Sequence, residues 1–328
     1  MKRIDIDSSN EGGRFDKFLI KHLPGAGTSF IYKMLRKKNI TLNKKKAAGN
    51  EILKAGDFIE IFFSDDTYEK FRKSDNRDSS TDVYISAFND IKDVEVLYED
   101  KDVVILNKPI GVLSQKAADK DISLNEWLIG YLLDNNEVTN DSLKDFKPSV
   151  CNRLDRNTAG IVLCGKSIKG SRALSKAIKE RKIDKYYVTL VKGIGLKEGE
   201  IKGSLVKDEK ANKVKVNLNE GDEIRTYIKP ISENDRLSYL EILLYTGKTH
   251  QIRATLAALS HPLVGDYKYG NKALNDKFKE EYGLEAQFLA CNKVVFPKSF
   301  PELENLSGKV IKASLPKLYE TIIHKEKL

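Results

Sequence analysis

Asp155 stands between two arginines, in the sequence Arg153-Leu154-Asp155-Arg156. An aspartate carboxylate has a reference pKa of about 3.9, and neighbouring positive charges favour its ionised form, so Asp155 is expected to be charged at neutral pH. An ionised carboxylate can act as a nucleophile or a base without further activation. The same acid could equally serve in a structural ion pair or a turn, and this segment leaves both possibilities open.

A second polar segment contains Thr249, His250 and Arg253. Thr249 is expected to cap a helix over residues 249–259, in which His250 and Arg253 project from roughly the same side. An arginine there could hold a substrate phosphate or fix the carboxylate of Asp155. His250 could shuttle a proton, although a structural hydrogen bond is the simpler interpretation of a single histidine.

A third segment, over residues 185–193, is expected to form a strand. Alternation along the strand places Lys185, Tyr187 and Thr189 on one face. An aromatic side chain beside an acidic site could stack under an unstacked RNA base. Tyr187 could equally be an ordinary core residue.

Strand-like segments dominate the chain from residue 93 to residue 328, several of them with a period of two. Besides the helix over 249–259, an amphipathic helix is expected over residues 171–181. Adjacent strands with few helices between them predict an α+β fold, with a mixed and mainly antiparallel sheet flanked by helices. The expected strands cover residues 94–98, 103–106, 161–164, 186–191, 214–218, 224–230 and 239–245.

A small α/β unit with a basic surface is expected over residues 1–63. Two amphipathic helices are expected there, the second capped by Thr28 and Ser29, followed by a β-like stretch over residues 40–43 and a strand over residues 58–63. Its candidate RNA-binding side chains are Lys33, Arg36, Lys37, Lys44, Lys45 and Lys46.

This small unit resembles an RNA-binding module named after a protein of the small ribosomal subunit. The resemblance implies that the basic surface binds RNA, and a solvated charged surface without a ligand is the alternative. The net charge of +9 and the pI of about 9.1 favour a polyanionic partner, because each phosphate contact releases a counterion. The residues that carry the likeness are Arg14, Asp16, Leu19, Ser29, Ile31, Leu35, Asn43, Gly56 and Asp57.

Residues 64–92 are polar and poor in apolar side chains over much of their length. This composition predicts a flexible linker, with a few apolar residues between 83 and 88 docking on the next domain. The predicted domains are therefore an RNA-binding module over residues 1–63, a linker over residues 64–92 and a catalytic domain over residues 93–328.

The composition excludes several other classes of protein. Hydrophobic residues make up 40% and charged residues 32% of the chain, which is typical of a soluble globular protein. No apolar run approaches the roughly 20 residues that cross a bilayer, and none follows the N-terminus as in a signal peptide. We therefore expect a cytoplasmic protein without a membrane partner. A zinc site and a disulfide framework are disfavoured by the wide spacing of Cys151, Cys164 and Cys291.

Four segments, taken in order, form one larger pattern: residues 98–111, 153–160, 185–193 and 247–266. This pattern resembles the RluA-type family of ribosomal RNA pseudouridine synthases. The likeness covers about residues 94–297, and four ordered motifs are more specific than any one of them. Members of the family that act on large-subunit RNA often carry the N-terminal RNA-binding module as well.

The chain departs from the usual residues of this family at several positions. None of the departures removes Asp155, Tyr187 or Arg253, so they bear on the choice of target site more than on the reaction. The departing residues are Gln115, Asn152, Asn157, Ala159, Lys248, Ala290 and Cys291.

The resemblance implies isomerisation of specific uridines to pseudouridine in ribosomal RNA, without a cofactor or a metal ion. Asp155 would act on a flipped-out uridine, Arg253 would keep Asp155 charged and aimed, and Tyr187 would stack on the base and assist a late proton removal. Arg156 is a candidate to enter the RNA stack where the uridine leaves it. Whether Asp155 attacks the sugar or the base stays open. Further substrate-binding candidates are Lys108, Arg153, His250 and Leu289.

Two other functions remain to be separated from this one. A non-catalytic factor for ribosomal RNA binding or ribosome assembly would need the basic module alone, and it would have no use for the acid, tyrosine and arginine motifs. A nuclease or base glycosylase could use the same acid, and it would release cut strands or free uracil. A monomer is the default expectation for the oligomeric state.

Overall fold

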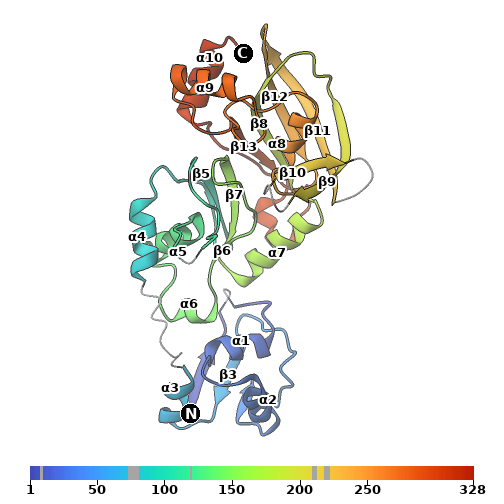
Figure 1. Ribbon diagram of the computed structural model, residues 1–328. Coiled ribbons are helices and arrows are strands. Elements are labelled where there is room, and N and C mark those ends of the chain that lie inside the picture. Colours follow the sequence, from blue (N-terminus) through green and yellow to red (C-terminus); the bar gives the residue numbers. More distant parts are fainter. Residues whose placement is uncertain (8–9, 73–80, 119, 209–212, 218–221) are drawn as a thin grey trace.

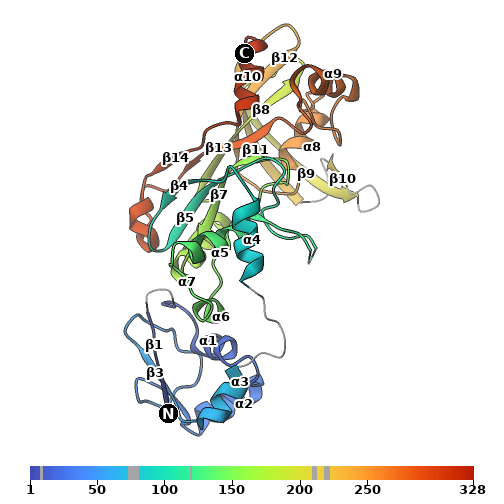
Figure 2. The ribbon, with the colours of Figure 1, turned by 90° about the vertical axis from the view of Figure 1, so that its left-hand side faces the viewer.

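The computed structural model describes residues 1–7, 10–72, 81–118, 120–208, 213–217 and 222–328, with side chains described outside residues 205–222. These residues form a small N-terminal unit and a larger unit that contains most of the strands (Figure 1). Helix α1 (Phe15–His22) of the small unit faces helix α6 (Ser142–Asp145) of the large one, as the second view also shows (Figure 2).

The small unit is a three-stranded antiparallel sheet in the order β1-β3-β2, whose core it shares with three helices. Phe15 and Leu19 of α1 are fully buried, as their helical spacing predicted. The predicted cap of the second helix is wrong, because the helix begins at Thr28 and the capping position is Gly27, which has no side chain to bond the first N–H groups. The further elements of this unit are β1 (Lys2–Asp5), α2 (Thr28–Arg36), β2 (Ile40–Leu42), β3 (Phe58–Ile61) and α3 (Asp65–Arg72).

Residues 64–92, expected to be a linker, contain two helices in their described part. Helix α3 packs Tyr68 onto the core of the small unit. Helix α4 (Asp82–Asp90) packs Tyr84 onto the large unit. The segment therefore belongs partly to each unit, while the polar residues 74–80 lie outside the described residues.

The docking predicted for residues 83–88 is present at two of the four apolar positions. Tyr84 is buried, and the ring of Phe88 lies 5.5 Å from Trp127 and 6.1 Å from Tyr131, measured between ring centroids. The other two side chains, Val83 and Ile85, are exposed.

The described part of the large unit is built on one 11-stranded sheet. Its main path runs β10-β9-β11-β12-β8-β13-β7-β5-β4, with β14 beside β13 and β6 beside β7. Among the described strands, β13 and β7 pair in parallel and the other neighbours are antiparallel, which confirms the predicted α+β fold with a mixed, mainly antiparallel sheet. The strands are β4 (Glu95–Glu99), β5 (Val103–Lys108), β6 (Ser149–Val150), β7 (Ala159–Gly165), β8 (Asp184–Lys192), β9 (Gly199–Asp208), β10 (Lys213–Asn217), β11 (Asp222–Glu233), β12 (Leu237–Leu244), β13 (Leu289–Val295) and β14 (Val310–Lys312).

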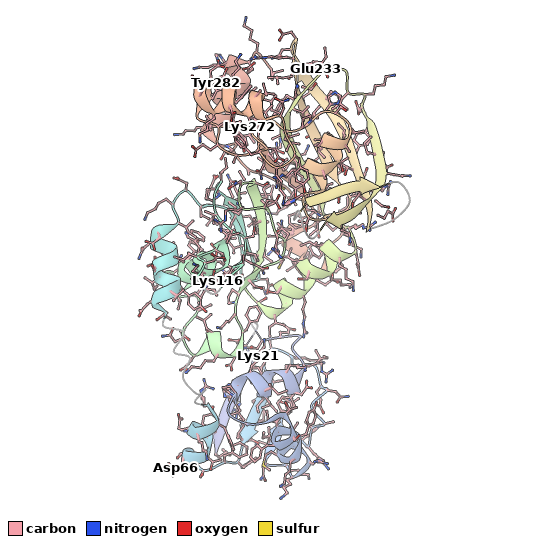
Figure 3. The ribbon with its side chains drawn as sticks, in the orientation of Figure 1. Lys21, Asp66, Lys116, Glu233, Lys272 and Tyr282 are labelled. Atoms are coloured by element: carbon pink, nitrogen blue, oxygen red, sulfur yellow. The ribbon has the colours of Figure 1, made fainter. Side chains whose placement is uncertain are left out.

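Helices flank this sheet. The predicted helix over residues 171–181 starts three residues earlier, at Ile168, because the hydroxyl of Ser167 accepts a hydrogen bond from Gly170 N–H and caps it. Lys272 and Tyr282 of α9 lie at the opposite end of the molecule from Asp66 of the small unit (Figure 3). The helices are α5 (Leu124–Asp134), α7 (Ile168–Lys179), α8 (Gln251–Ala258), α9 (Lys272–Tyr282), α10 (Lys317–Lys325) and a 3₁₀ helix (Pro301–Leu306).

A glycine allows β13 to lie directly beside β7. Gly160 has a φ of +112°, and a Cβ atom there would lie 2.1 Å from the carbonyl oxygen of Cys291. The two strands pair in parallel at Ala290 with Ala159 and at Cys291 with Gly160. Because Asp155 lies just before β7, Gly160 sets the loop of Asp155 close to the first residues of β13.

Three general features of the described residues bear on function. No helix among them combines the length and the apolar character needed to cross a membrane. They contain no group of three or more histidine, cysteine or acidic side chains that could hold a metal ion. The three cysteines are free thiols.

Candidate active site

A loop of residues 151–158 joins β6 to β7 and carries Asp155. The side chain of Asn152 ties the start of this loop to β7. Its Oδ1 accepts a hydrogen bond of 2.7 Å from Leu163 N–H, and its Nδ2 donates a weaker one of 3.3 Å to the carbonyl of Ile161. An amide can donate and accept at once, so the asparagine that replaces the family's usual histidine has a structural role here.

Ser114 and Lys108 form hydrogen bonds with the backbone of the same loop. The hydroxyl of Ser114 accepts a hydrogen bond of 2.9 Å from Leu154 N–H and donates one of 3.0 Å to the carbonyl of the same residue. Lys108 is fully buried, and its ammonium donates to the carbonyl of Arg156 at 3.1 Å and to two carbonyls of its own segment at 2.9 and 2.8 Å. Burial lowers the pKa of Lys108 to about 7, and the nearby Asp155 carboxylate opposes this shift.

One guanidinium connects two carboxylates at the centre of the site. Arg253 of α8 donates from Nη1 to Asp155 Oδ2 at 3.0 Å. It also donates from Nε and Nη2 to the two oxygens of Asp266, at 2.7 and 2.9 Å. The side chain of Asp266 is 0% exposed and that of Arg253 is 9% exposed, whereas that of Asp155 is 30% exposed. Asp155 is therefore the acid that a ligand can reach.

Asp266 fixes the direction in which Arg253 points. Its Oδ1 also accepts hydrogen bonds from the N–H groups of Lys268 and Tyr269, at 2.9 and 3.1 Å. Burial alone would raise the pKa of Asp266, yet the Arg253 guanidinium and these two N–H groups lower it overall. Despite burial, the two carboxylates raise the pKa of Arg253 above its ordinary value. The Arg253–Asp266 ion pair stays charged, and its bidentate contact fixes the orientation of the guanidinium.

Helix α8 does not begin as predicted. His250 occupies the position before the helix, in a left-handed conformation with φ +55° and ψ +20°, and Thr249 precedes it. The side chain of Gln251 anchors the first turn, since its Nε2 donates to Thr226 Oγ1 of β11 at 2.9 Å. The predicted Thr249 cap is therefore wrong, although Arg253 still lies in the first turn of the helix.

His250 reaches the same carboxylate as Arg253. Its Nε2 lies 3.8 Å from Asp155 Oδ2, and its Nδ1 lies 3.0 Å from the hydroxyl oxygen of Tyr269. Burial lowers the pKa of His250, Asp155 opposes this shift, and the positive charges of Arg253 and Lys268 lower the pKa further. A neutral imidazole is the expected form at neutral pH.

Tyr187 lies on β8. It is 6% exposed and is paired in register with Cys291 of β13. Burial, the Cys291 thiol and the Asp155 carboxylate together raise the pKa of Tyr187 well above its ordinary value. At neutral pH its phenol can donate a hydrogen bond but cannot act as a phenolate base. Lys185 and Leu289, two further predicted positions, are buried on the same two strands.

The remaining predicted residues lie at the surface. Arg153 and Arg156 are both exposed on the loop that carries Asp155. The carbonyl of Arg156 is held by Lys108 and by Gly111 N–H, so its backbone is fixed while its side chain projects outward. All six predicted RNA-binding residues are exposed on the small unit: Lys33, Arg36, Lys37, Lys44, Lys45 and Lys46.

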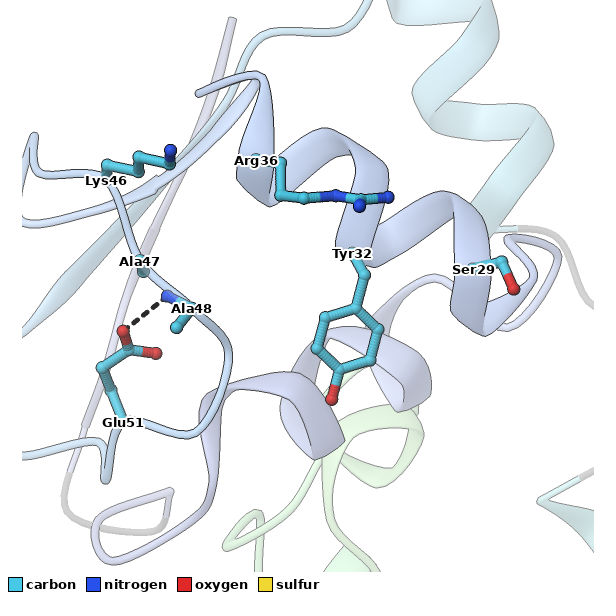
Figure 4. A pocket seen from close by; sticks show the side chains of 7 residues that line it. All are labelled: Ser29, Tyr32, Arg36, Lys46, Ala47, Ala48 and Glu51. Atoms are coloured by element: carbon cyan, nitrogen blue, oxygen red, sulfur yellow. Dashed lines mark hydrogen bonds between the residues drawn. The ribbon is translucent and has the colours of Figure 1, made fainter.

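A pocket of about 730 Å³ lies in the small unit, between α2 and the segment that follows β2. Figure 4 shows Tyr32 and Arg36 on the helix and Lys46 and Glu51 on the facing segment. The hydroxyl of Tyr32 donates to Asp16 at 2.7 Å, and the carboxylate of Glu51 accepts from nearby backbone N–H groups. Two of the six basic side chains thus border a hollow that also contains an aromatic ring.

Sequence reasoning named most of the residues that meet at this site, but not all of them. It gave no role to Ser114, Asp266 or Tyr269. Asp266 had one signal, its place directly after Gly265 in the fourth motif, whereas a single serine and a single tyrosine carry no sequence signal of this kind. Chemically, the assembled site offers an accessible ionised carboxylate, aimed by a guanidinium, with a phenol and an imidazole near it.

Comparisons with known proteins identify the same region. The family model for RNA pseudouridylate synthase matches residues 102–258, which include Asp155, Tyr187 and Arg253. An uncharacterized RNA pseudouridine synthase of Mycoplasma genitalium is 32% identical, over 97% of this chain and 97% of the relative. A ribosomal large subunit pseudouridine synthase C of Rickettsia bellii is 31% identical, over 90% of this chain and 94% of the relative.

A solved structure supports the fold. Human RNA pseudouridylate synthase domain containing 4 superposes with a TM-score of 0.58 at 18% identity, covering 76% of this chain and 97% of the human one. The fold, the ordered motifs and relatives above 30% identity along nearly the whole length agree with one another. The chain therefore belongs to the family of RNA pseudouridine synthases, enzymes that form pseudouridine in RNA.

Proposed function

We propose that this protein isomerises specific uridines to pseudouridine in ribosomal RNA, and that its substrate is large-subunit RNA. The Rickettsia bellii relative is named as a synthase of the large ribosomal subunit, and the order of motifs in the chain predicted the same class of substrate. The net charge of +9 suits a polyanionic substrate.

The contact between Asp155 and Arg253 is the observation that carries the proposal. The side chain of Asp155 is 30% exposed and that of Arg253 is 9% exposed, so a ligand can contact the carboxylate while the arginine stays buried behind it. In the proposed reaction Asp155 acts on a uridine that has left the RNA stack, and Arg253 keeps the carboxylate charged and aimed.

Residues around the acid would receive the nucleotide. Tyr187 would contact the base and act as a hydrogen-bond donor in its phenol form, and Leu289 would pack beside it. Arg156, with its fixed backbone and exposed side chain, would fill the gap that the uridine leaves. Unstacking a base costs a few kcal/mol, so a side chain that replaces it makes the flipped state accessible.

The small unit would bind RNA at a distance from the acid. Its six exposed basic side chains would contact phosphates, and the pocket bordered by Tyr32, Arg36 and Lys46 could hold one nucleotide by stacking and charge. We keep the division into a module over residues 1–63, a connecting segment over residues 64–92 and a catalytic domain over residues 93–328 as part of the proposal. A cytoplasmic monomer stays a prediction.

Release of tritium from ribosomal RNA labelled at carbon five of uridine tests the reaction directly, because that hydrogen is lost when the new bond forms. The wild-type protein should release tritium from large-subunit RNA. Asp155→Asn should release none while it binds the RNA with nearly unchanged affinity. Asp276→Asn, a control at an exposed acid of α9, should behave as the wild type.

The same experiment separates the alternatives. A non-catalytic RNA-binding factor would bind the RNA and release no tritium from any fragment, although the protein is folded. A glycosylase or a nuclease would yield free uracil or cut strands, which product analysis detects. Full activity of Asp155→Asn would refute the assignment of the acid.

A further inference from the structure

Tyr269, in the loop between α8 and α9, contacts both basic residues that face Asp155. Its hydroxyl lies 3.0 Å from His250 Nδ1, and the two rings are T-shaped with centroids 5.6 Å apart. The guanidinium of Arg253 lies 5.2 Å from the centre of the tyrosine ring. The backbone N–H of Tyr269 bonds to Asp266, so the turn that aims Arg253 also positions Tyr269.

The surroundings of His250 favour one tautomer of its ring. A neutral imidazole has one N–H donor and one acceptor nitrogen. If Tyr269 donates to Nδ1, the proton lies on Nε2 and points toward the Asp155 carboxylate. In the other tautomer, the lone pair of Nε2 would face that carboxylate, which is repulsive. The first arrangement is therefore preferred, with the hydroxyl of Tyr269 as the donor.

Both basic residues approach the same oxygen of Asp155. Arg253 Nη1 lies 3.0 Å and His250 Nε2 lies 3.8 Å from Oδ2. Both contacts engage Oδ2, and among the described residues no hydrogen bond to Oδ1 is present. His250 has a left-handed backbone, a conformation that histidine adopts more readily than most residues with a side chain.

We propose that Tyr269 is a positioning residue, which holds His250 in the tautomer whose Nε2–H points toward Oδ2 of Asp155, so that Oδ1 is the oxygen presented to the nucleotide. The inference rests on the proposed function, in which Asp155 acts on a uridine. It adds a residue outside the acid, tyrosine and arginine motifs, and it assigns separate tasks to the two oxygens of one carboxylate.

The charged groups that face His250 are consistent with a neutral ring. Asp155 and Asp266 favour the protonated form, whereas Arg253, Lys268 and burial disfavour it, and together they lower the pKa of His250. A neutral ring has a single proton to place, so its tautomer depends on the partner at Nδ1. That partner is the hydroxyl of Tyr269.

Tyr269→Phe tests the inference because it keeps the ring and removes the hydroxyl. We expect kcat for tritium release to fall roughly 3- to 10-fold, the effect of one net hydrogen bond, while KM for the RNA changes less than about 2-fold. Tyr267→Phe is the matched control, since Tyr267 is exposed and its hydroxyl donates to Asp276. The control should retain wild-type kcat.

Two variants of His250 distinguish a role in positioning Asp155 from a role in the stability of the fold. His250→Asn suits the left-handed backbone but is too short to reach Asp155, so it should lower kcat about 10-fold and leave the thermal midpoint unchanged. His250→Gln suits the backbone less well, yet its amide N–H can reach toward Oδ2, so it should restore part of kcat. Adding Tyr269→Phe to His250→Asn should cause no further loss, because the tyrosine acts through the histidine.

The results that overturn the inference are specific. Wild-type kcat in Tyr269→Phe, equal losses in both tyrosine variants, or losses that multiply in the double variant would each refute it. Asp155→Asn, assayed beside them, separates this inference from the proposed function. If that variant is inactive while Tyr269→Phe is unaffected, the inference alone fails; if Asp155→Asn is active, the proposed function fails with it.

Discussion

Arg253→Met removes the guanidinium that two carboxylates share, and its effect on stability can be worked from the structure. Asp266 is 0% exposed and keeps only its two N–H contacts when Arg253 is gone. Removing one partner of a buried ion pair costs about 3–5 kcal/mol, because the remaining charge stays buried without compensation. Asp155 is partly exposed, so it can recover water and adds little to this cost.

Urea unfolding measures this cost through the single tryptophan of the chain. Trp127 is 5% exposed, and it lies in the same hydrophobic cluster as Ile252, the neighbour of Arg253. For a urea m-value of roughly 2–3 kcal/mol/M, the fluorescence midpoint should fall by about 1–2 M. Arg225→Met is the control, because Arg225 pairs with Glu200 at the surface, and its midpoint should change little.

The loss should depend on pH. In the wild type the pKa of Asp266 is lowered, so this acid contributes stability above pH about 4 and loses it as the pH falls through the lowered value. In Arg253→Met, burial should instead raise the pKa of Asp266 above its unfolded value of about 3.9. The variant is then penalised at neutral pH and recovers as the acid takes up a proton. The difference between the two proteins should therefore shrink from pH 7 toward pH 4.5.

Two outcomes would refute this reasoning. A loss below about 1 kcal/mol at pH 7 would mean that Asp266 is not the buried charge that the structure describes. A loss of the expected size that stays constant from pH 7 to pH 4.5 would mean that side-chain packing, and not the charge, is what Arg253 supplies.

Two further variants test the support of the Asp155 loop. Gly160→Ala should destabilise the protein by about 2–4 kcal/mol in the same urea assay, because its Cβ would meet the carbonyl of Cys291 at 2.1 Å and its φ is +112°. Gly199→Ala is the control and should be close to neutral, since no atom lies within 4 Å of the added Cβ. Lys108→Met should cost about 2–3 kcal/mol and lower kcat in the tritium assay, because three partly buried carbonyls lose their hydrogen bond to the ammonium group; unchanged kcat would show that Lys108 does not set the loop of Asp155.

The sequence was sufficient for the elements whose patterns are local. The antiparallel strands with alternating residues, the two helices of the small unit and the order of the motifs around Asp155, Tyr187 and Arg253 could be predicted from periodicity and resemblance. The elements that were not predicted lack such a local pattern. Strand β9 is largely polar, and the residues of β13 do not alternate regularly between buried and less buried positions, so neither strand stands out from loop sequence. The start of α8 was misplaced because a left-handed histidine replaces the usual side-chain cap.

The site was predicted less completely than the fold, because several of its contacts join distant segments. Asp155 and Arg253 are separated by 98 positions in the chain, and the resemblance, not the spacing, linked them. The double hydrogen bond of Ser114 to Leu154 crosses 40 positions and leaves no pattern in either segment. Contacts of this kind depend on how strands are ordered in the sheet, which a local pattern does not specify.

The unequal burial of the two acids decides their roles. Arg253 contacts both, yet Asp266 is enclosed and also bonds two backbone N–H groups, so it orients the guanidinium before any RNA arrives. One positive charge shared by two negative ones leaves the group with an excess negative charge, so Asp155 is held in place without being neutralised. An acid that reacts with a nucleotide must be held in position and must keep its negative charge. It follows that the competence of Asp155 depends on the turn at residues 266–269, a segment of which only the first residue, Asp266, belongs to a motif recognised in the sequence.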